Sequence, residues 1–199
     1  MRLKKLSLSI TMLVGACISA LPVFADSHGN FPGKGDEEAW KRSCAPIHNS
    51  NILYKQGDYQ GAIKLDKEAI SIYPYDSAIY HNLGNALAKL GKLDEARQAQ
   101  EQALELEPKF VGAWISLGVT YEKQRCLADA ERCYRKAVQV EPCYEALGDL
   151  GDILRQQGKF DEAMQIMLRA KACPENARYP GQADKFIDMC RQHRKEASN

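Results

Sequence analysis

Residues 114–142 read WISLGVTYEKQRCLADAERCYRKAVQVEP, and this stretch decides the fold. Its small residues Gly118, Ala130 and Ala137 have counterparts along much of the chain. Successive alanines that align with Ala130 are 34 residues apart, or 33 at the last step, and each is followed seven residues later by a second alanine: Ala62 and Ala69, Ala96 and Ala103, Ala130 and Ala137, Ala163 and Ala170. A fixed period of this length is typical of a helical solenoid.

Each repeating unit contains two helical patterns. Within residues 80–90 the apolar side chains fall on one helical face, and residues 93–106 show the same periodicity again. Gly91 separates the two patterns because glycine readily adopts the backbone angles that end a helix. Each unit also has a small residue in its first helix and a proline after its second helix: Ser50, Gly84, Gly118 and Gly151, then Pro74, Pro108, Pro142 and Pro174. The chain is therefore predicted to form helical pairs that pack tightly at their small residues.

The turn inside the third unit departs from this pattern. Gly57, Gly91 and Gly158 occupy the same place in their units, whereas the third unit has Arg125 there. Because arginine is disfavoured in the left-handed conformation, this turn should be strained or should take another shape.

The third unit resembles the tetratricopeptide repeat family most closely, through Trp114-x-x-Leu117-Gly118-x-x-Tyr121, Ala130-x-x-x-Tyr134, Ala137 and Pro142. The first unit is the weakest match, because Asn49-Ser50 stands where Leu-Gly is expected. The repeat and the resemblance predict an all-α, right-handed superhelical solenoid of four helical hairpins over residues 44–180. Residues 181–199 are predicted to form a capping helix and tail, with one apolar face: Ala183, Phe186, Ile187 and Cys190.

The N-terminus has the features of an export signal. A short basic region precedes an apolar run, and Val23-Phe24-Ala25 fits cleavage after Ala25, so residues 1–25 are predicted to be a signal peptide and 26–43 a flexible linker. In an alternative, Cys17 is lipidated and holds the protein at a membrane face. Both alternatives predict export, to the periplasm or beyond. The processed chain would carry 24 basic and 26 acidic side chains, which gives no electrostatic reason to expect nucleic acid as a partner.

Six cysteines would remain after processing, and an even number in an exported chain suggests disulfides. Cys143 and Cys173 are the best candidate pair, since both follow the second helix of their units. No spacing typical of a metal site, a cofactor or an enzyme family occurs, so we expect a non-catalytic protein without metal or cofactor. A cysteine-dependent redox protein or chaperone is the alternative.

The resemblance implies that the first helices line a groove that holds a peptide or a segment of a partner protein. The implied groove residues from these helices are Ile47, Asn51, Tyr54, His81, Asn82, Asn85, Lys89, Ile115, Ser116, Val119, Lys123, Asp149, Asp152 and Arg155. Asn51 and Asn85 occupy the same place in successive units and could bind a peptide backbone. Ile47, Gly112 and Ser116 stand where the basic residues of a carboxylate-binding member would be needed. The groove is expected to become acidic toward Asp149 and Asp152.

Overall fold

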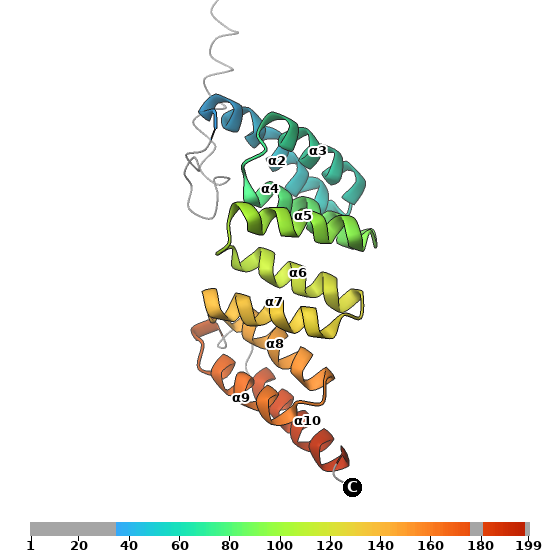
Figure 1. Cartoon of the computed structure of the whole chain (residues 1–199), viewed down its shortest axis with the longest axis vertical. Helices are drawn as coiled ribbons and strands as arrows, with labels where there is room; N and C mark the ends of the chain where they lie inside the picture. The colour runs from blue at the N-terminus through green and yellow to red at the C-terminus, as the bar shows by residue number, and fades with distance from the viewer. Residues whose placement is uncertain (1–34, 176–180, 198–199) are drawn as a thin grey trace, which may run out of the picture.

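The computed structural model describes residues 35–175 and 181–197, and these residues form nine α-helices. Their bounds are α2 Glu37–Gln56, α3 Tyr59–Ile72, α4 Ser77–Lys89, α5 Leu93–Leu106, α6 Val111–Lys123, α7 Leu127–Val140, α8 Tyr144–Gln156, α9 Phe160–Lys171 and α10 Gln182–Ala197. The helices follow one another in chain order along the long axis of the molecule, from α2 and α3 at one end to α9 and α10 at the other (Figure 1). The predicted signal peptide and Cys17 lie outside the described residues.

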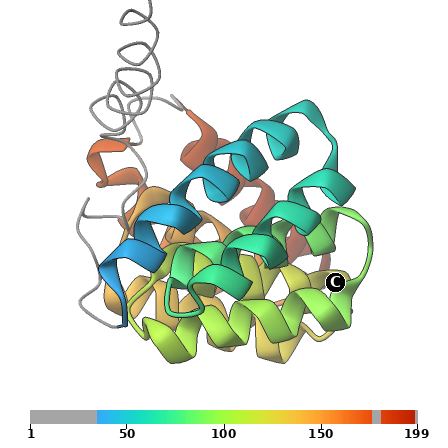
Figure 2. The same ribbon diagram turned by 90° about the horizontal axis from the view of Figure 1, so that it is seen from above.

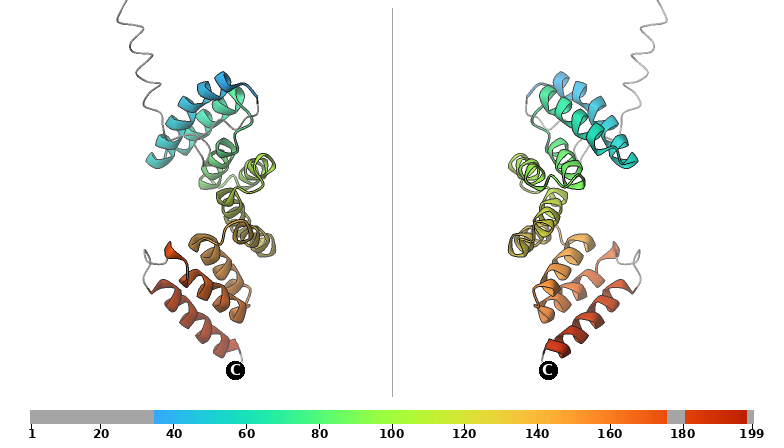
Figure 3. Two further views of the ribbon diagram at one scale, coloured as in Figure 1. Left: turned by 90° about the vertical axis from the view of Figure 1, so that its left-hand side faces the viewer. Right: turned by 90° about the vertical axis from the view of Figure 1, so that its right-hand side faces the viewer.

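The helices pack as four consecutive hairpins. The strongest contacts join α2 to α3, α4 to α5, α6 to α7 and α8 to α9, and each second helix also contacts the first helix of the next hairpin. Successive hairpins are turned relative to one another, as the end-on and side views show (Figures 2 and 3). Helix α10 packs against α9 and covers the last hairpin. The predicted arrangement of four hairpins and a capping helix is confirmed.

Small residues mark the places where helices approach closely. All eight alanines of the repeat are completely buried. Gly118 of α6 faces the ring of Tyr134 on α7, which is also completely buried. Larger side chains fill the space between hairpins, among them Leu150 and Leu154 of α8. The small residues therefore recur at a fixed period because each one lies at a close contact between neighbouring helices.

The turns between the two helices of each hairpin share one geometry. In each, an amide two or three residues past the end of the first helix donates to a carbonyl five residues earlier, at 2.9–3.0 Å: Asp58 to Leu53, Lys92 to Leu87, Cys126 to Tyr121 and Lys159 to Leu154. Gly57, Gly91 and Gly158 have φ between 76° and 85°, and Arg125 has φ 64°. The arginine turn thus has the same shape as the glycine turns and carries backbone strain.

Helix α2 begins earlier than the sequence analysis predicted. Its first residue, Glu37, lies inside the segment expected to be a linker up to residue 43. The Asp36 side chain caps the helix by accepting from Glu38 N at 2.9 Å, and Glu37 forms an ion pair with Lys41 at 2.7 Å. Ala39 is buried as well. The linker was predicted from the charged, glycine-containing composition of this segment. The N-cap and the burial of Ala39 nevertheless stabilise a helix from Glu37 onward.

Candidate functional site

The first helices of the hairpins lie next to one another. Helix α4 contacts both α2 and α6, and Gln156 of α8 donates to Glu122 of α6 at 2.7 Å, so residues of these four helices share one side of the array. We call this side the inner face and define it by the predicted groove residues that are not buried: Asn51, Tyr54, His81, Asn82, Asn85, Lys89, Ser116, Val119, Lys123, Asp149, Asp152 and Arg155. Ile47 and Ile115, which helical projection also placed there, are buried in the core, and that part of the prediction is wrong.

On α2, Asn51 and Tyr54 are half-buried. The Tyr54 ring packs edge-on against Tyr59 of α3, with the ring centroids 5.3 Å apart. Tyr54 is thus held by its own hairpin, where it also packs against the apolar core. The Asn51 side chain makes no hydrogen bond to another part of the chain that the structure describes, so its amide is free to bind a ligand.

On α4, His81 and Asn85 form a connected pair. Asn85 Nδ2 lies 2.9 Å from His81 Nε2, and the His81 ring lies 4.9 Å from the ring of Phe110. Burial lowers the pKa of His81 to about 4, so the imidazole is neutral at pH 7. Asn82 is half-buried and Lys89 is exposed beside them. Around His81 and Asn85 this part of the inner face is polar, aromatic and uncharged, and Lys89 adds one cation at the end of the helix.

On α6, Val119 is 37% exposed and Ser116 is half-buried. The Ser116 carbonyl accepts from Thr120 Oγ1 at 3.0 Å. Lys123 Nζ donates to the carbonyl of Ala88 on α4 at 3.2 Å, which links neighbouring first helices at the rim. The α6 contribution is therefore a small, mainly apolar surface with one cation at its edge.

The inner face becomes acidic between α6 and α8. Burial, and then the charges of Glu145, Glu122 and Asp152, raise the pKa of Asp149 to about 7. Glu122 also accepts from the Tyr134 hydroxyl at 2.9 Å. Asp149 and Asp152 were predicted from the sequence, whereas Glu122 was not, because its place here depends on the contact with Tyr134 of the second helix. A cation placed here would favour the ionised form of Asp149.

Arg155 makes two contacts that its place in the sequence did not predict. Its guanidinium pairs with Asp152 at 2.6 Å on the same helix and lies 6.0 Å from the centroid of the Phe186 ring on α10. Asp152 also accepts from Gln156 Nε2 at 3.0 Å. The arginine thus links the last hairpin to the capping helix, and its charge is largely neutralised by Asp152.

The cysteines in the described residues are all free thiols. Cys173 Sγ donates to the Pro142 carbonyl at 3.3 Å, which places it beside Cys143, but the predicted disulfide between them is not formed in the structure. Burial is the main factor that raises the pKa of Cys173, and Cys143 raises it further. Within residues 35–175 and 181–197, no three potential ligands come together to hold a metal ion.

The family models match where the repeats lie. One tetratricopeptide repeat model matches residues 42–109 and a second matches residues 120–177, which together cover more than half of the chain. The chain belongs to the tetratricopeptide repeat family. No match was found among curated proteins. Proteins of this family are typically binding scaffolds and are usually not catalytic. In the part of this chain that the structure describes, no helix has the length and apolar character needed to cross a membrane.

Solved structures of tetratricopeptide repeat proteins show the same fold. The MamA protein matches with a TM-score of 0.65 and 18% identity over 82% of this chain and 88% of that one. The first repeat domain of Spaghetti (RPAP3), solved with the HSP90 peptide SRMEEVD, matches with a TM-score of 0.57 and 23% identity. The match covers 59% of this chain and 94% of that one. The second repeat domain of human RPAP3, solved with an HSP70 peptide, matches with a TM-score of 0.55 and 22% identity. The match covers 58% of this chain and 97% of that one.

Proposed function

We propose that this protein is a non-catalytic scaffold that holds an extended peptide or a segment of a partner protein along its inner face. The observation that carries the proposal is the change along this face from the uncharged surface around His81, Asn85 and Val119 to the carboxylates of Glu122, Asp149 and Asp152 at the junction of α6 and α8. Two similar domains were solved with peptides of partner proteins, which supports a binding role for the fold.

The chemistry of the inner face selects the kind of segment. His81 and Phe110 provide a neutral aromatic surface, and Asn85 retains an amide oxygen that can accept from a peptide N–H. Glu122 and Asp149 provide negative charge farther along. The bound segment would therefore place apolar or neutral residues against α4 and α6 and a lysine or arginine against α8. A C-terminal carboxylate is not favoured, because Ile47, Gly112 and Ser116 supply no charge to bind it.

We also propose an exported location, on the basis of residues 1–25. Cleavage after Ala25 would release the scaffold into the periplasm or outside the cell, whereas lipidation of Cys17 would hold it at a membrane face. Radiolabelled fatty acid distinguishes the two: label that is lost in Cys17→Ser supports the lipidated form, and an N-terminus at Asp26 supports cleavage. In the alternative of a redox protein, one cysteine would carry the activity instead of the inner face.

Fluorescence anisotropy with two labelled synthetic peptides tests the binding function. Both share one neutral, apolar extended segment, and one ends in two lysines while the other ends in two glutamates. We expect the lysine peptide to bind about tenfold more tightly at low salt, with the difference shrinking as salt is added. Asp149→Lys should abolish the preference. Glu68→Gln, an exposed change on a second helix, is the matched control and should not alter it.

The pH dependence gives a second readout. Because the pKa of Asp149 is about 7, affinity for the lysine peptide should increase as the pH rises through 7 and the carboxyl group ionises. The dependence should be absent in Asp149→Asn. Equal affinity for both peptides, unchanged by Asp149→Lys, would show that the acidic end of the inner face does not bind the partner.

A further inference from the structure

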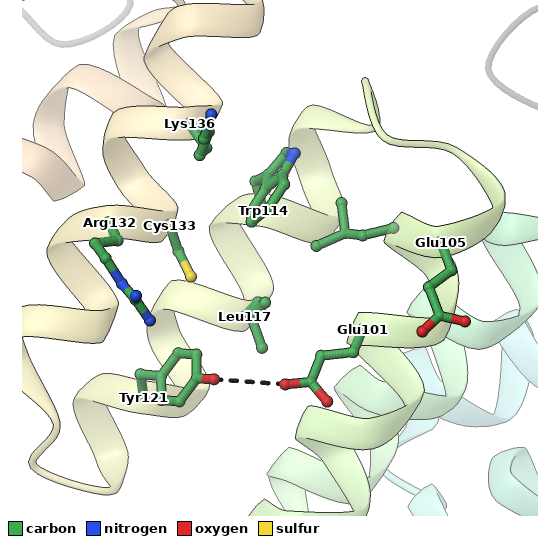
Figure 4. Close-up of a pocket in the computed structure, with 9 residues that line it drawn as sticks. Glu101, Glu105, Trp114, Leu117, Tyr121, Arg132, Cys133 and Lys136 are labelled. Atoms are coloured by element: carbon green, nitrogen blue, oxygen red, sulfur yellow. Dashed lines mark hydrogen bonds between the residues drawn. The ribbon is translucent and has the colours of Figure 1, made fainter.

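A second concave surface lies on the other side of the array. It is a cavity of about 520 Å³ between the second helices α5 and α7, with α6 at its base (Figure 4). Nine residues line it: Glu101, Leu104, Glu105, Trp114, Leu117, Tyr121, Arg132, Cys133 and Lys136. At 100° per residue, the α6 residues that line the cavity point away from Ser116, Val119 and Lys123. The cavity is therefore separate from the inner face.

The base of the cavity is apolar, and its tryptophan is held by a hydrogen bond. Trp114 Nε1 donates to the Pro108 carbonyl at 2.9 Å, which fixes the indole against the cavity. Leu104 of α5 and Leu117 of α6 add aliphatic surface. Burial raises the pKa of Cys133 to about 12, so this residue contributes a neutral thiol. Aromatic and aliphatic side chains at the base of a cavity of this size are the usual anchors for a partner's apolar side chains.

The two walls carry opposite charges. Glu101 and Glu105 lie four residues apart on α5, and Arg132 and Lys136 lie four residues apart on α7, so each pair projects from one face of its helix (Figure 4). Their partners in the structure lie on the same helix, except for a long contact from the Tyr121 hydroxyl to Glu101 at 3.5 Å. These local partners are Arg97 for Glu101, Gln102 for Glu105, Asp129 for Arg132 and Gln139 for Lys136.

No ion pair joins the α5 wall to the α7 wall among residues 35–175, and the cavity stays open between them. Because these charges pair only within their own helices and not across the cavity, both walls can still pair with a third helix. Such a helix, about 10–12 Å across, would present cations to α5 and anions to α7.

This charge arrangement is confined to one junction of the array. The repeat period aligns the α5 pair with Lys67 and Ser71 of α3 and with Arg135 and Gln139 of α7. It aligns the α7 pair with Gln98 and Gln102 of α5 and with Gln165 and Arg169 of α9. Opposed walls of two acids and two bases therefore occur between α5 and α7 and not at the other junctions. The pattern is a property of this surface and not of the repeat.

We propose that this cavity is a docking site for an amphipathic α-helix of a partner protein. The helix places its apolar stripe against Trp114 and Leu117, a basic flank beside Glu105 and an acidic flank beside Lys136. The site is independent of the inner face, so the scaffold can hold two partner segments at once.

Three synthetic helical peptides of about five turns test this site. They share one leucine stripe, and their flanks carry lysine on one side and glutamate on the other, lysine on both sides, or glutamate on both sides. Emission of Trp114, in a Trp40→Phe background, reports binding of these tryptophan-free peptides. We expect the mixed peptide to bind about threefold to tenfold more tightly than either single-sign peptide, the effect of one or two accessible ion pairs. A peptide with its two flanks exchanged would be a poor control, because it could bind in the opposite direction and make the same ion pairs. Peptides with flanks of a single sign are therefore used for comparison.

Two charge reversals make the prediction sharper. Lys136→Glu makes both walls acidic and should give the all-lysine peptide the highest affinity, while Glu105→Lys makes both walls basic and should favour the all-glutamate peptide. Glu68→Lys, an exposed change on α3 that belongs to neither surface, is the control and should leave the ranking as in the wild type. The proposal would be overturned if all three peptides bound equally or if none bound. It would also be overturned if the rankings did not follow the two charge reversals. Self-association in sedimentation that Lys136→Glu abolishes would overturn it as well, since a second copy would then be the occupant.

Discussion

Gly118 on α6 lies directly against the ring of Tyr134 on α7. A Cβ atom at residue 118 would stand 2.5 Å from Tyr134 Cε1 and 2.8 Å from two further ring atoms, closer than carbon atoms can approach. The Tyr134 ring is completely buried and cannot move aside. The same relation between a glycine of the first helix and a long side chain of the second helix recurs in two other hairpins: Gly84 with Gln100 and Gly151 with Met167.

Gly118→Ala should therefore destabilise the protein by about 1–3 kcal/mol, although alanine favours a helix more than glycine does. Gly148→Ala is the matched control, because Gly148 is also helical but has nothing within 4 Å of an added Cβ. That change should stabilise the protein by about 0.5–1 kcal/mol. Urea unfolding followed by circular dichroism measures both. A Gly118→Ala protein as stable as the wild type would mean that the two helices can separate at no cost.

Much of the fold could be predicted because these contacts recur at a fixed period. Ala130 and Ala137 are completely buried, as their spacing predicted, and Pro142 follows the end of α7. A position that must be small in each hairpin leaves the same signal in every unit. The start of α2 has no such repeat, and it depends on one capping side chain, Asp36, which the period does not show.

Arg125→Gly should stabilise the protein by about 1 kcal/mol. Arg125 has φ 64°, a conformation that is unfavourable for residues with a Cβ, and the turn around it keeps the same hydrogen bonds as the glycine turns. Gly91→Ala tests the converse, since residue 91 has φ 76° and open space around it. It should destabilise by a similar amount, through the backbone alone. Thermal or urea unfolding would contradict the strain if both variants matched the wild type.

The candidate site was less predictable than the fold. Helical projection places His81 and Asp149 on the inner face, where both are half-buried, but it does not show what they contact. Phe110, from the loop before α6, covers the His81 ring, and Phe186 of α10 lies beside Arg155. These neighbours come from other elements at irregular sequence distances, so a pattern of spacing within one helix contains no information about them.

Asp66 makes stability depend on pH. Its side chain is completely buried on α3, and neither carboxyl oxygen has a hydrogen-bond partner among the described residues. Burial raises the pKa of Asp66 from 3.8 to about 7, and the nearby Ser50 hydroxyl, which donates to the Ala62 carbonyl at 3.2 Å, offsets only a small part of this effect. The folded protein thus holds this proton more tightly than the unfolded chain. The free energy of unfolding should rise as the pH falls from 7 toward 4, by up to about 4 kcal/mol from this group.

Asp66→Asn should remove this contribution to the slope and leave the pH dependence of Asp149, whose pKa is also about 7. Urea unfolding at a series of pH values between 4 and 8 measures the slope. Glu68→Gln, an exposed neighbour on the same helix, is the control and should keep the wild-type slope. If Asp66→Asn keeps it too, the carboxyl group is not buried in its neutral form.

The proximity of Cys173 to Cys143 leads to a prediction for oxidising conditions. Cys173 Sγ already contacts the carbonyl of the residue before Cys143, at 3.3 Å. Oxidation should join the two cysteines, which non-reducing peptide mapping would detect as one linked pair. Because the bridge closes a loop of about 30 residues, it should stabilise the last hairpin by about 3–4 kcal/mol. Cys143→Ser should remove this gain. A different pairing in the peptide map would show that these thiols cannot align.

The order in which the thiols react separates the scaffold from the redox alternative. Cys126 is exposed, whereas Cys133 and Cys190 are buried, and burial raises the pKa of both, to about 12 for Cys133. A buried neutral thiol is a poor nucleophile. In the reduced native protein at pH 8, Ellman's reagent should therefore modify Cys126 rapidly and reach Cys133 and Cys190 only after unfolding in urea. Cys126→Ser should remove the fast phase and leave peptide binding unchanged. A buried cysteine that reacts faster than free cysteine would favour the redox protein, because that rate requires a thiolate stabilised by its surroundings, which the geometry around Cys133 and Cys190 does not provide.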